Sequence, residues 1–120
     1  MTEKISALEI ARQFLGKRVL VAIDRPLGSL HPLHGFAYPV NYGSLPGVPA
    51  PDGEDLDAYV LGIDRPLAQF EGDCIAIIHR LDDDDDKLVV VPAGYEPDDA
   101  QICDQTLFQE QFFKSVVLRI

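Results

Sequence analysis

The sequence predicts an α+β fold, in which a small closed or half-closed β-barrel carries helices at its two ends. Short apolar runs bounded by proline, glycine or charged residues are typical of strands. Helical periodicity is confined to the first and last segments. The chain has 120 residues, a length that accommodates one hydrophobic core. We therefore expect residues 1–120 to form a single domain.

The first helix is expected over Ser6–Leu15. Apolar residues recur there at helical spacing and form one face, made by Ala7, Ile10, Ala11 and Phe14. Gly16 ends the helix. A strand follows over Val19–Asp24, and Pro26 and Gly28 then form a turn.

Two irregular segments come next. Leu30–Pro39 contains His31 and His34 but shows no helical period. Two histidines three residues apart, without a third ligand nearby, are a weak zinc signal, so we interpret them as ordinary loop residues or phosphate contacts. Tyr38–Ala58 contains too many prolines and glycines for a helix. We interpret it as a long, rigid loop that leads into a buried strand.

Buried strands and a helical segment fill the second half. The strands are expected at Ala58–Gly62, Asp73–Arg80 and Lys87–Pro92. In the middle strand, simple alternation would place Cys74, Ala76 and Ile78 on one face. The last segment, Glu96–Ile120, has apolar residues at roughly helical spacing. It forms either two helices or one helix that ends near Lys114 before a short strand, Val116–Ile120.

Composition narrows the classes of partner. The net charge of −10 and the pI near 4.5 argue against nucleic acid and against an anionic membrane surface. The opening residues, MTEKISALEIARQF, lack the apolar core of a signal peptide. Cys74 and Cys103 have no motif spacing and are interpreted as reduced thiols. These features favour a cytoplasmic protein.

Two acidic clusters adjoin the predicted strands. The first contains Asp52, Glu54, Asp55 and Asp57, and the second is the run Asp82–Asp86. Closely spaced carboxylates repel one another unless water or a cation separates them. The sequence therefore indicates one metal site assembled from both clusters. Within the run we interpret Asp83, Asp84 and Asp86 as solvated, and we interpret His79 and Arg80 as polar residues at a strand end.

Three segments in register carry a resemblance to a known family. YPVNYGSLPG begins at Tyr38, APDGEDLDAYVLG begins at Ala50, and the acidic loop ends in DDKLVVVP at Pro92. In order and spacing they resemble the soluble inorganic pyrophosphatases of family I, over roughly residues 19–114. The resemblance implies a twisted, mostly antiparallel, OB-like β-barrel flanked by helices. It also implies a homo-oligomeric hydrolase that converts pyrophosphate to two phosphates by means of a metal-activated water.

The resemblance also implies which side chains hold metal and activate water. The metal ligands would be Asp52, Asp57, Asp82 and Asp85. Glu54 stands where the family has an aspartate that orients or deprotonates the attacking water. Glu54, Asp52 and Lys87 are therefore the expected catalytic residues. Mg²⁺ is the implied cofactor, with Mn²⁺ as the alternative, because hard divalent ions take oxygen ligands.

Cationic and hydroxyl side chains are expected to bind the phosphates. Tyr42 matches the tyrosine of the family's NYG segment, Lys87 follows the acidic loop, and Lys114 matches the lysine of a late Tyr-Lys pair. Such donors stabilise charge on phosphoryl groups. Arg25 is expected to join them. Asp24 aligns with a glutamate near the start of the family's barrel.

Departures from the family pattern leave alternatives open. Glu54 is one methylene longer than the family's aspartate, and Phe113 replaces the tyrosine of the Tyr-Lys pair. The acidic loop is two residues shorter, so Asp83 is an alternative to Asp82. The family hairpin that supplies a lysine, a glutamate and an arginine is largely missing. The candidates to replace its donors in part are Arg25, Ser29, His31 and His34. The alternative functions are a phosphohydrolase for another phosphorylated substrate, or an inactive domain that binds metal or phosphate.

Overall fold

The structure is a computed structural model that describes residues 5–120. Residues 1–4 lie outside the described residues. They are the first part of the segment MTEKISALEIARQF, which we expect not to be a signal peptide. No helix in the described part of the chain is long and apolar enough to cross a membrane.

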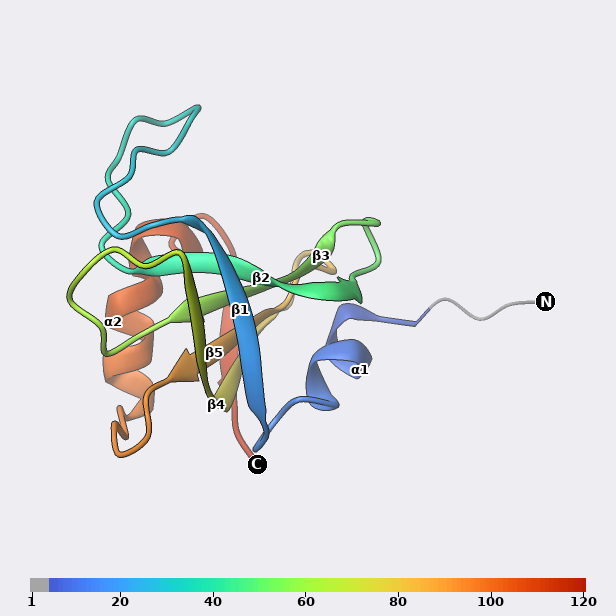
Figure 1. The fold of residues 1–120 in the computed structure, drawn as a ribbon. Helices are drawn as coiled ribbons and strands as arrows, with labels where there is room; N and C mark the ends of the chain where they lie inside the picture. The colour runs from blue at the N-terminus through green and yellow to red at the C-terminus, as the bar shows by residue number, and fades with distance from the viewer. Residues whose placement is uncertain (1–4) are drawn as a thin grey trace.

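Five strands close into a barrel within residues 5–120 (Figure 1). They are β1 (Arg18–Arg25), β2 (Asn41–Pro49), β3 (Asp55–Val60), β4 (Gln69–Arg80) and β5 (Lys87–Val91). Their order is β1-β2-β3-β5-β4, and β4 pairs back with β1. Only the β3–β5 pair is parallel. A further strand, β6 (Ser115–Leu118), extends the sheet beside β4. The predicted α+β class, with a mostly antiparallel barrel, is confirmed.

The helices are shorter than the sequence pattern predicts. α1 (Ala7–Arg12) begins after Ser6, whose hydroxyl accepts the N–H of Glu9. α2 (Asp99–Glu110) begins with a capping box in which Asp98 and Gln101 satisfy each other's backbone N–H groups. Of the two alternatives for the last segment, the one with a single helix followed by a strand is confirmed, although both end earlier than expected.

The prediction of a long loop over Tyr38–Ala58 is wrong. β2 occupies much of this segment and pairs with both β1 and β3. Pro46 is tolerated because the register between β2 and β3 is interrupted between Ser44 and Pro49, and Pro49 is the last residue of β2. A proline cannot donate to a ladder, so it is found where a strand lacks a continuous partner.

Two hydrophobic clusters lie on the two faces of the barrel wall. The inner cluster takes residues from all five barrel strands, for example Val21, Leu45 and Ala58. The outer cluster joins the wall to Ile102 and Phe108 of α2. A register shift in β4 lies between Cys74 and Ala76 and places them in different clusters, so the predicted common face is wrong at this point.

Candidate functional site

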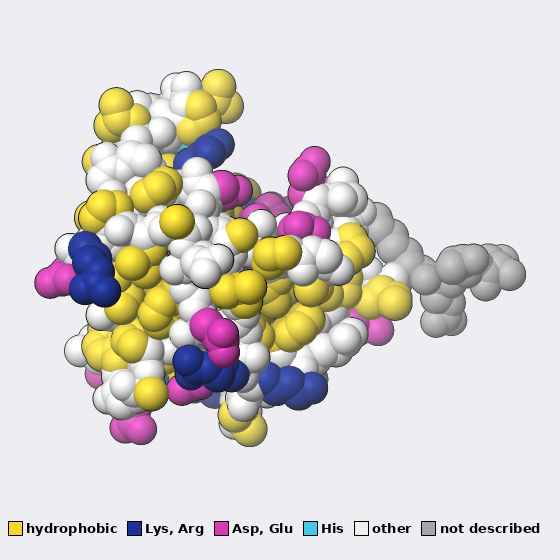
Figure 2. All heavy atoms as spheres, viewed as in Figure 1, with side chains coloured by type: hydrophobic (Ala, Val, Ile, Leu, Met, Phe, Trp, Pro, Cys, Tyr) yellow, Lys and Arg dark blue, Asp and Glu magenta, His cyan; other side chains and the backbone are white. Residues whose placement is uncertain are grey.

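A cavity of about 420 Å³ lies where the β1–β2 connection and the C-terminal end of α2 meet the barrel wall. The β1–β2 connection projects from the body of the molecule (Figure 1). Figure 2 shows a cationic and an acidic side chain next to each other at its base. Most of the side chains that line the cavity fall into two groups. The charged cluster contains Asp24, Arg25, Asp57, Arg80, Asp85 and Lys87, and the aromatic cluster contains His31, His34, Phe36 and Phe112.

The parallel pairing of β3 and β5 brings Asp57 beside Lys87. Ala58 is in register with Leu88, so the residues just before them also lie side by side. Both face the outer side of the barrel wall, because Tyr59 and Val89, two residues further on, belong to the outer cluster. The Lys87 side chain is 3% exposed, and its ammonium lies 2.6 Å from Asp57 Oδ2 and 2.9 Å from Asp85 Oδ1. Lys87 therefore bridges two of the predicted metal ligands.

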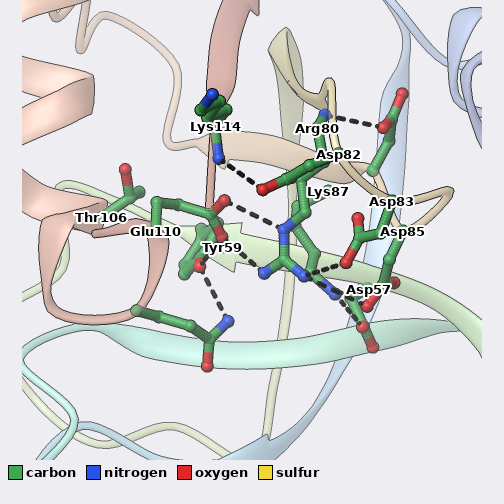
Figure 3. A network of polar contacts seen from close by, with 12 residues as sticks. Asp57, Tyr59, Arg80, Asp82, Asp83, Asp85, Lys87, Thr106, Glu110 and Lys114 are labelled. Carbon is green, nitrogen blue, oxygen red and sulfur yellow. Dashed lines mark hydrogen bonds and ion pairs between the residues drawn. The ribbon is translucent and has the colours of Figure 1, made fainter. Parts of the chain in front are cut away.

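Arg80 is a buried cation at the end of β4. Its guanidinium makes a two-point contact with Glu110, with Nε 3.1 Å and Nη2 2.9 Å from the carboxylate oxygens. Its Nη1 lies 3.3 Å from Asp83 and 3.4 Å from Asp85 (Figure 3). The guanidinium carbon also lies 3.6 Å from the centre of the Phe113 ring. Burial alone would lower the pKa of Arg80, but these carboxylates raise it above its ordinary value, so the charge is permanent.

Every aspartate of the acidic run has a partner within the protein. Asp82 accepts the backbone N–H of Lys114, and Asp84 accepts that of Ala7 at the start of α1. Asp83 and Asp85 pair with Arg80, as described above. Asp86 is buried and accepts the N–H of Arg80 at 3.0 Å, while its other oxygen lies 2.8 Å from His79 Nδ1. The expectation that Asp86 is solvated is therefore wrong, and much of the run ties the β4–β5 turn to neighbouring segments.

The YPVNYG segment has structural and site roles. Asn41 is fully buried, and its side chain accepts the N–H groups of Leu27 and Leu67 and donates to the carbonyl of Arg65. It thereby ties together two connections at this end of the barrel. Gly43 is required because a Cβ there would collide with the backbone of Ala22 on β1. Tyr42, between them, lines the cavity.

The tyrosine hydroxyl at this site stays protonated. Burial raises the pKa of Tyr42 well above its ordinary value, and the nearby Asp57 carboxylate raises it further. The Tyr42 ring also lies 5.9 Å from the Lys87 ammonium. Tyr42 is therefore placed as a hydrogen-bond donor beside the charged cluster.

The aromatic cluster joins two segments that are far apart in the sequence. His34 lies over Phe112 with ring centres 6.2 Å apart and an angle of 26° between the planes. His31 contacts His34 and Phe36 at 4.7 and 4.8 Å. Phe36 in turn packs edge-on against Phe108 of α2 at 5.7 Å. These contacts hold the projecting β1–β2 connection against the end of α2.

The structure brings together about half of the residues predicted from sequence. The members that line the cavity are Arg25, Tyr42, Asp57, Asp85 and Lys87. Asp52 and Glu54 lie instead on the exposed β2–β3 turn, where Asp52 accepts the N–H of Glu54. Asp82 and Lys114 are exposed, and they contact each other rather than the cavity.

Sequence reasoning missed Arg80 and Glu110 as parts of the site. Arg80 was interpreted as a polar strand end, yet it is 4% exposed and lines the cavity. Its main partner, Glu110, lies 30 residues away, so no local pattern connects the two. The available signal was a lone arginine directly after an apolar strand and before five aspartates.

The carboxylates present fit a divalent cation that is completed by substrate. Asp57 and Asp85 are 30% and 38% exposed and present hard oxygen ligands to the cavity. Within residues 5–120, no group of three or more His, Cys, Asp or Glu side chains is arranged to hold a metal by itself. Mg²⁺ commonly uses one or two carboxylates together with water and substrate phosphates, so a pair of carboxylates is sufficient for it.

Comparisons with known proteins agree with the motifs. A family model described as inorganic pyrophosphatase matches residues 9–117. No curated protein sequence matches the chain. Among solved structures, an inorganic pyrophosphatase from Ehrlichia chaffeensis has a TM-score of 0.70 at 17% identity, with 88% of each chain covered. One from Coxiella burnetii has a TM-score of 0.60 at 20% identity, covering 85% of this chain and 84% of that one. A third, from Helicobacter pylori, has a TM-score of 0.61 at 18% identity, covering 85% and 82%. At these identities the structural matches show the fold, whereas the family model confirms the resemblance.

Proposed function

The chain belongs to the inorganic pyrophosphatase family, and on this premise we propose that it hydrolyses pyrophosphate to two phosphates with the help of Mg²⁺ or Mn²⁺. The observation that supports the proposal most directly is the side-by-side placement of Asp57, Asp85 and Lys87 at the wall of one cavity. Two carboxylates suited to a hard cation, next to a buried ammonium suited to phosphate, are what hydrolysis of a diphosphate requires.

The residues on the cavity wall would divide the work by charge. Asp57 and Asp85 would hold the divalent cation, which when bound supplies charge neutralisation and a water of lowered pKa. Lys87, Arg80 and Arg25 would neutralise the phosphate oxygens, and phosphoryl transfer depends mainly on such positioning and electrostatics. The hydroxyl of Tyr42 would donate a hydrogen bond to the phosphate side.

Four of the proposed residues lie outside the cavity wall. We retain Asp52 and Asp82 as proposed ligands, Glu54 as the proposed base for water, and Lys114 as a proposed phosphate contact. Asp52 and Glu54 lie only a few residues before Asp57, on a turn whose Gly53 has a φ of 89°. Their proposed roles require the β2–β3 turn to move toward the cavity when metal and substrate bind.

The proposal is tested by measuring phosphate release from pyrophosphate with and without Mg²⁺. Asp57→Asn and Asp85→Asn are expected to abolish Mg²⁺-dependent turnover. Asp83→Asn is the matched control, because Asp83 lies in the same acidic run and pairs with the same Arg80 but does not line the cavity. It is expected to retain most of the activity.

A second readout separates catalysis from binding. The melting temperature is measured with and without about 10 mM Mg²⁺ and pyrophosphate. A rise in the native protein that is absent in Asp85→Asn would show binding to the native state. Binding without turnover would indicate an inactive relative or a different phosphorylated substrate. No response of either kind would overturn the proposal.

The remaining proposals concern partners and location. We propose a cytoplasmic homo-oligomer that acts on a small phosphorylated substrate and does not use nucleic acid or membrane as a partner. The two cysteines are unpaired with each other, with Cys74 buried and Cys103 exposed. Sedimentation measurements would determine the oligomeric state.

A further inference from the structure

The cavity offers an apolar surface that pyrophosphate does not use. Pyrophosphate has about nine non-hydrogen atoms and no apolar part, whereas cavities of about 300–1,000 Å³ are typical of sites for larger organic ligands. The cavity here measures about 420 Å³ and has aromatic as well as charged walls. An occupant with both a charged and an apolar part would use the whole of it.

The aromatic cluster is anchored by packing against α2, and part of it is exposed to solvent. Phe36 packs against Phe108, which also contacts the buried Tyr38 at 5.4 Å. Phe112, in contrast, is 65% exposed although it is a large apolar ring. His34, which lies over it, is also exposed. A well-anchored aromatic surface that is left open to water is characteristic of a binding site.

The arrangement of the rings favours a flat ligand. The planes of His34 and Phe36 lie within 6° of parallel, and those of His34 and Phe112 within 26°. Near-parallel rings that are open to solvent leave flat faces on which another ring can stack in the same orientation. His31 adds a polar group at this wall, since its Nδ1 accepts the N–H groups of Leu33 and His34 and the ring proton of the neutral form is therefore on Nε2. A nucleobase combines a flat face with acceptors on its edge.

We propose that the aromatic cluster binds the base of a nucleoside diphosphate whose two phosphates lie in the charged cluster. This inference rests on the proposed function, because it places the diphosphate where pyrophosphate would be hydrolysed. In the reaction, a water oxygen bonds to the terminal phosphorus and the bond from that phosphorus to the bridging oxygen breaks. The bridging oxygen leaves on the nucleoside monophosphate, the terminal group leaves as inorganic phosphate, and one proton passes to solvent.

The test compares ADP, inorganic pyrophosphate and an aliphatic diphosphate of similar size. Affinities are measured by calorimetry without hydrolysis, with Ca²⁺ in place of Mg²⁺, and turnover is measured by phosphate release in Mg²⁺. The native protein is expected to bind ADP more tightly than the aliphatic diphosphate and to release phosphate from ADP. Phe112→Leu, which keeps an apolar side chain but removes the ring, is expected to weaken ADP binding about ten- to a hundred-fold more than pyrophosphate binding. Leu107→Ala is the matched control, because Leu107 lies in α2 shortly before Phe112, is also an exposed apolar residue and does not line the cavity.

The outcomes separate this inference from the proposed function. Pyrophosphate hydrolysis without binding or hydrolysis of ADP would overturn the nucleotide site and leave the proposed function intact. Failure to bind or hydrolyse either substrate would overturn both. Tighter binding of the aliphatic diphosphate, or an equal loss of ADP and pyrophosphate affinity in Phe112→Leu, would also overturn the inference. A change of sedimentation coefficient in Phe112→Leu, with ADP affinity retained, would identify the aromatic cluster as a contact between copies of the chain and would refute the site.

Discussion

Removing the carboxylate of Glu110 is expected to destabilise the protein far more than removing that of Asp83, which contacts the same arginine. Arg80 is 4% exposed and Glu110 is 6% exposed, and two nitrogen–oxygen contacts of 3.1 and 2.9 Å join them. Glu110 also accepts the Tyr59 hydroxyl at 2.6 Å. Breaking a buried ion pair by removing one partner costs about 3–5 kcal/mol, and in Glu110→Gln the Nε and Nη2 of Arg80 would lose their charged partner. At roughly 4 °C per kcal/mol for a chain of this length, Glu110→Gln should melt about 12–20 °C lower.

The assay is thermal unfolding followed by circular dichroism at pH 7, with Asp83→Asn as the control. Asp83 contacts the same guanidinium at 3.3 Å, but it is 36% exposed, so its loss should cost less than about 1 kcal/mol. The double variant Arg80→Met, Glu110→Leu removes both charges and should recover most of the stability. Because Arg80 also lines the cavity, the double variant should nevertheless lose pyrophosphate hydrolysis. A Glu110→Gln protein that melts within about 3 °C of Asp83→Asn would refute the reasoning.

Three further predictions concern single side chains. If Glu54 orients the attacking water, Glu54→Gln should lose turnover in the phosphate-release assay but keep Mg²⁺ affinity by calorimetry; loss of both would make Glu54 a ligand instead. Burial raises the pKa of the Cys74 thiol to about 12, so a thiol reagent at pH 8 should label Cys103 in the native protein and Cys74 only after unfolding. Burial also raises the pKa of Asp86 above its ordinary value of 3.8, so the stability that this carboxyl contributes is complete below that pH and is lost as the pH rises through the folded value. Urea unfolding from about pH 4 to 7 should show wild type losing stability relative to Asp86→Asn; a constant difference would contradict this.

The strands were predictable because each repeats an apolar pattern over neighbouring residues. Lys87–Pro92 was expected as a buried strand, and β5 covers Lys87–Val91. β2 was missed because its two prolines suggested a loop, and only pairing with β1 and β3 makes the segment a strand. The register shift at Cys74 was likewise invisible in the sequence, since alternation assumes a regular ladder.

The grouping of candidate site residues was predictable where the sheet brings two motifs together, and it was not predictable where the partners lie far apart in the sequence. The neighbouring positions of Asp57 and Lys87 follow from the parallel pairing of β3 and β5. The acidic run is different, because Ala7 and Lys114, from opposite ends of the chain, take up Asp84 and Asp82 as backbone partners. Composition alone suggested a metal cluster for these residues. Their partners became evident only from the fold.

The charges of the cavity wall balance within the protein itself, although the whole chain carries −10. The carboxylates Asp57 and Asp85 are paired with the cations Lys87 and Arg80. A divalent cation must compete with these pairs for the carboxylates, and a diphosphate must compete for the cations. If both bind, the divalent cation pairs with the carboxylates and the diphosphate pairs with the cationic side chains. Neither set of side chains is then left without a partner.

Binding of metal and substrate should therefore be mutually reinforcing. By linkage, pyrophosphate should raise Mg²⁺ affinity by the same factor by which Mg²⁺ raises pyrophosphate affinity, typically about 5- to 150-fold. Calorimetric titrations on Glu54→Gln, the variant expected to bind without turnover, would measure both factors. In Lys87→Met the carboxylates lose their competitor, so Mg²⁺ should bind more tightly in the absence of substrate and the coupling should shrink. If Lys87→Met leaves the Mg²⁺ affinity unchanged, Asp57 and Asp85 do not hold the cation. The metal site would then have to be sought among Asp52, Glu54 and the exposed aspartates.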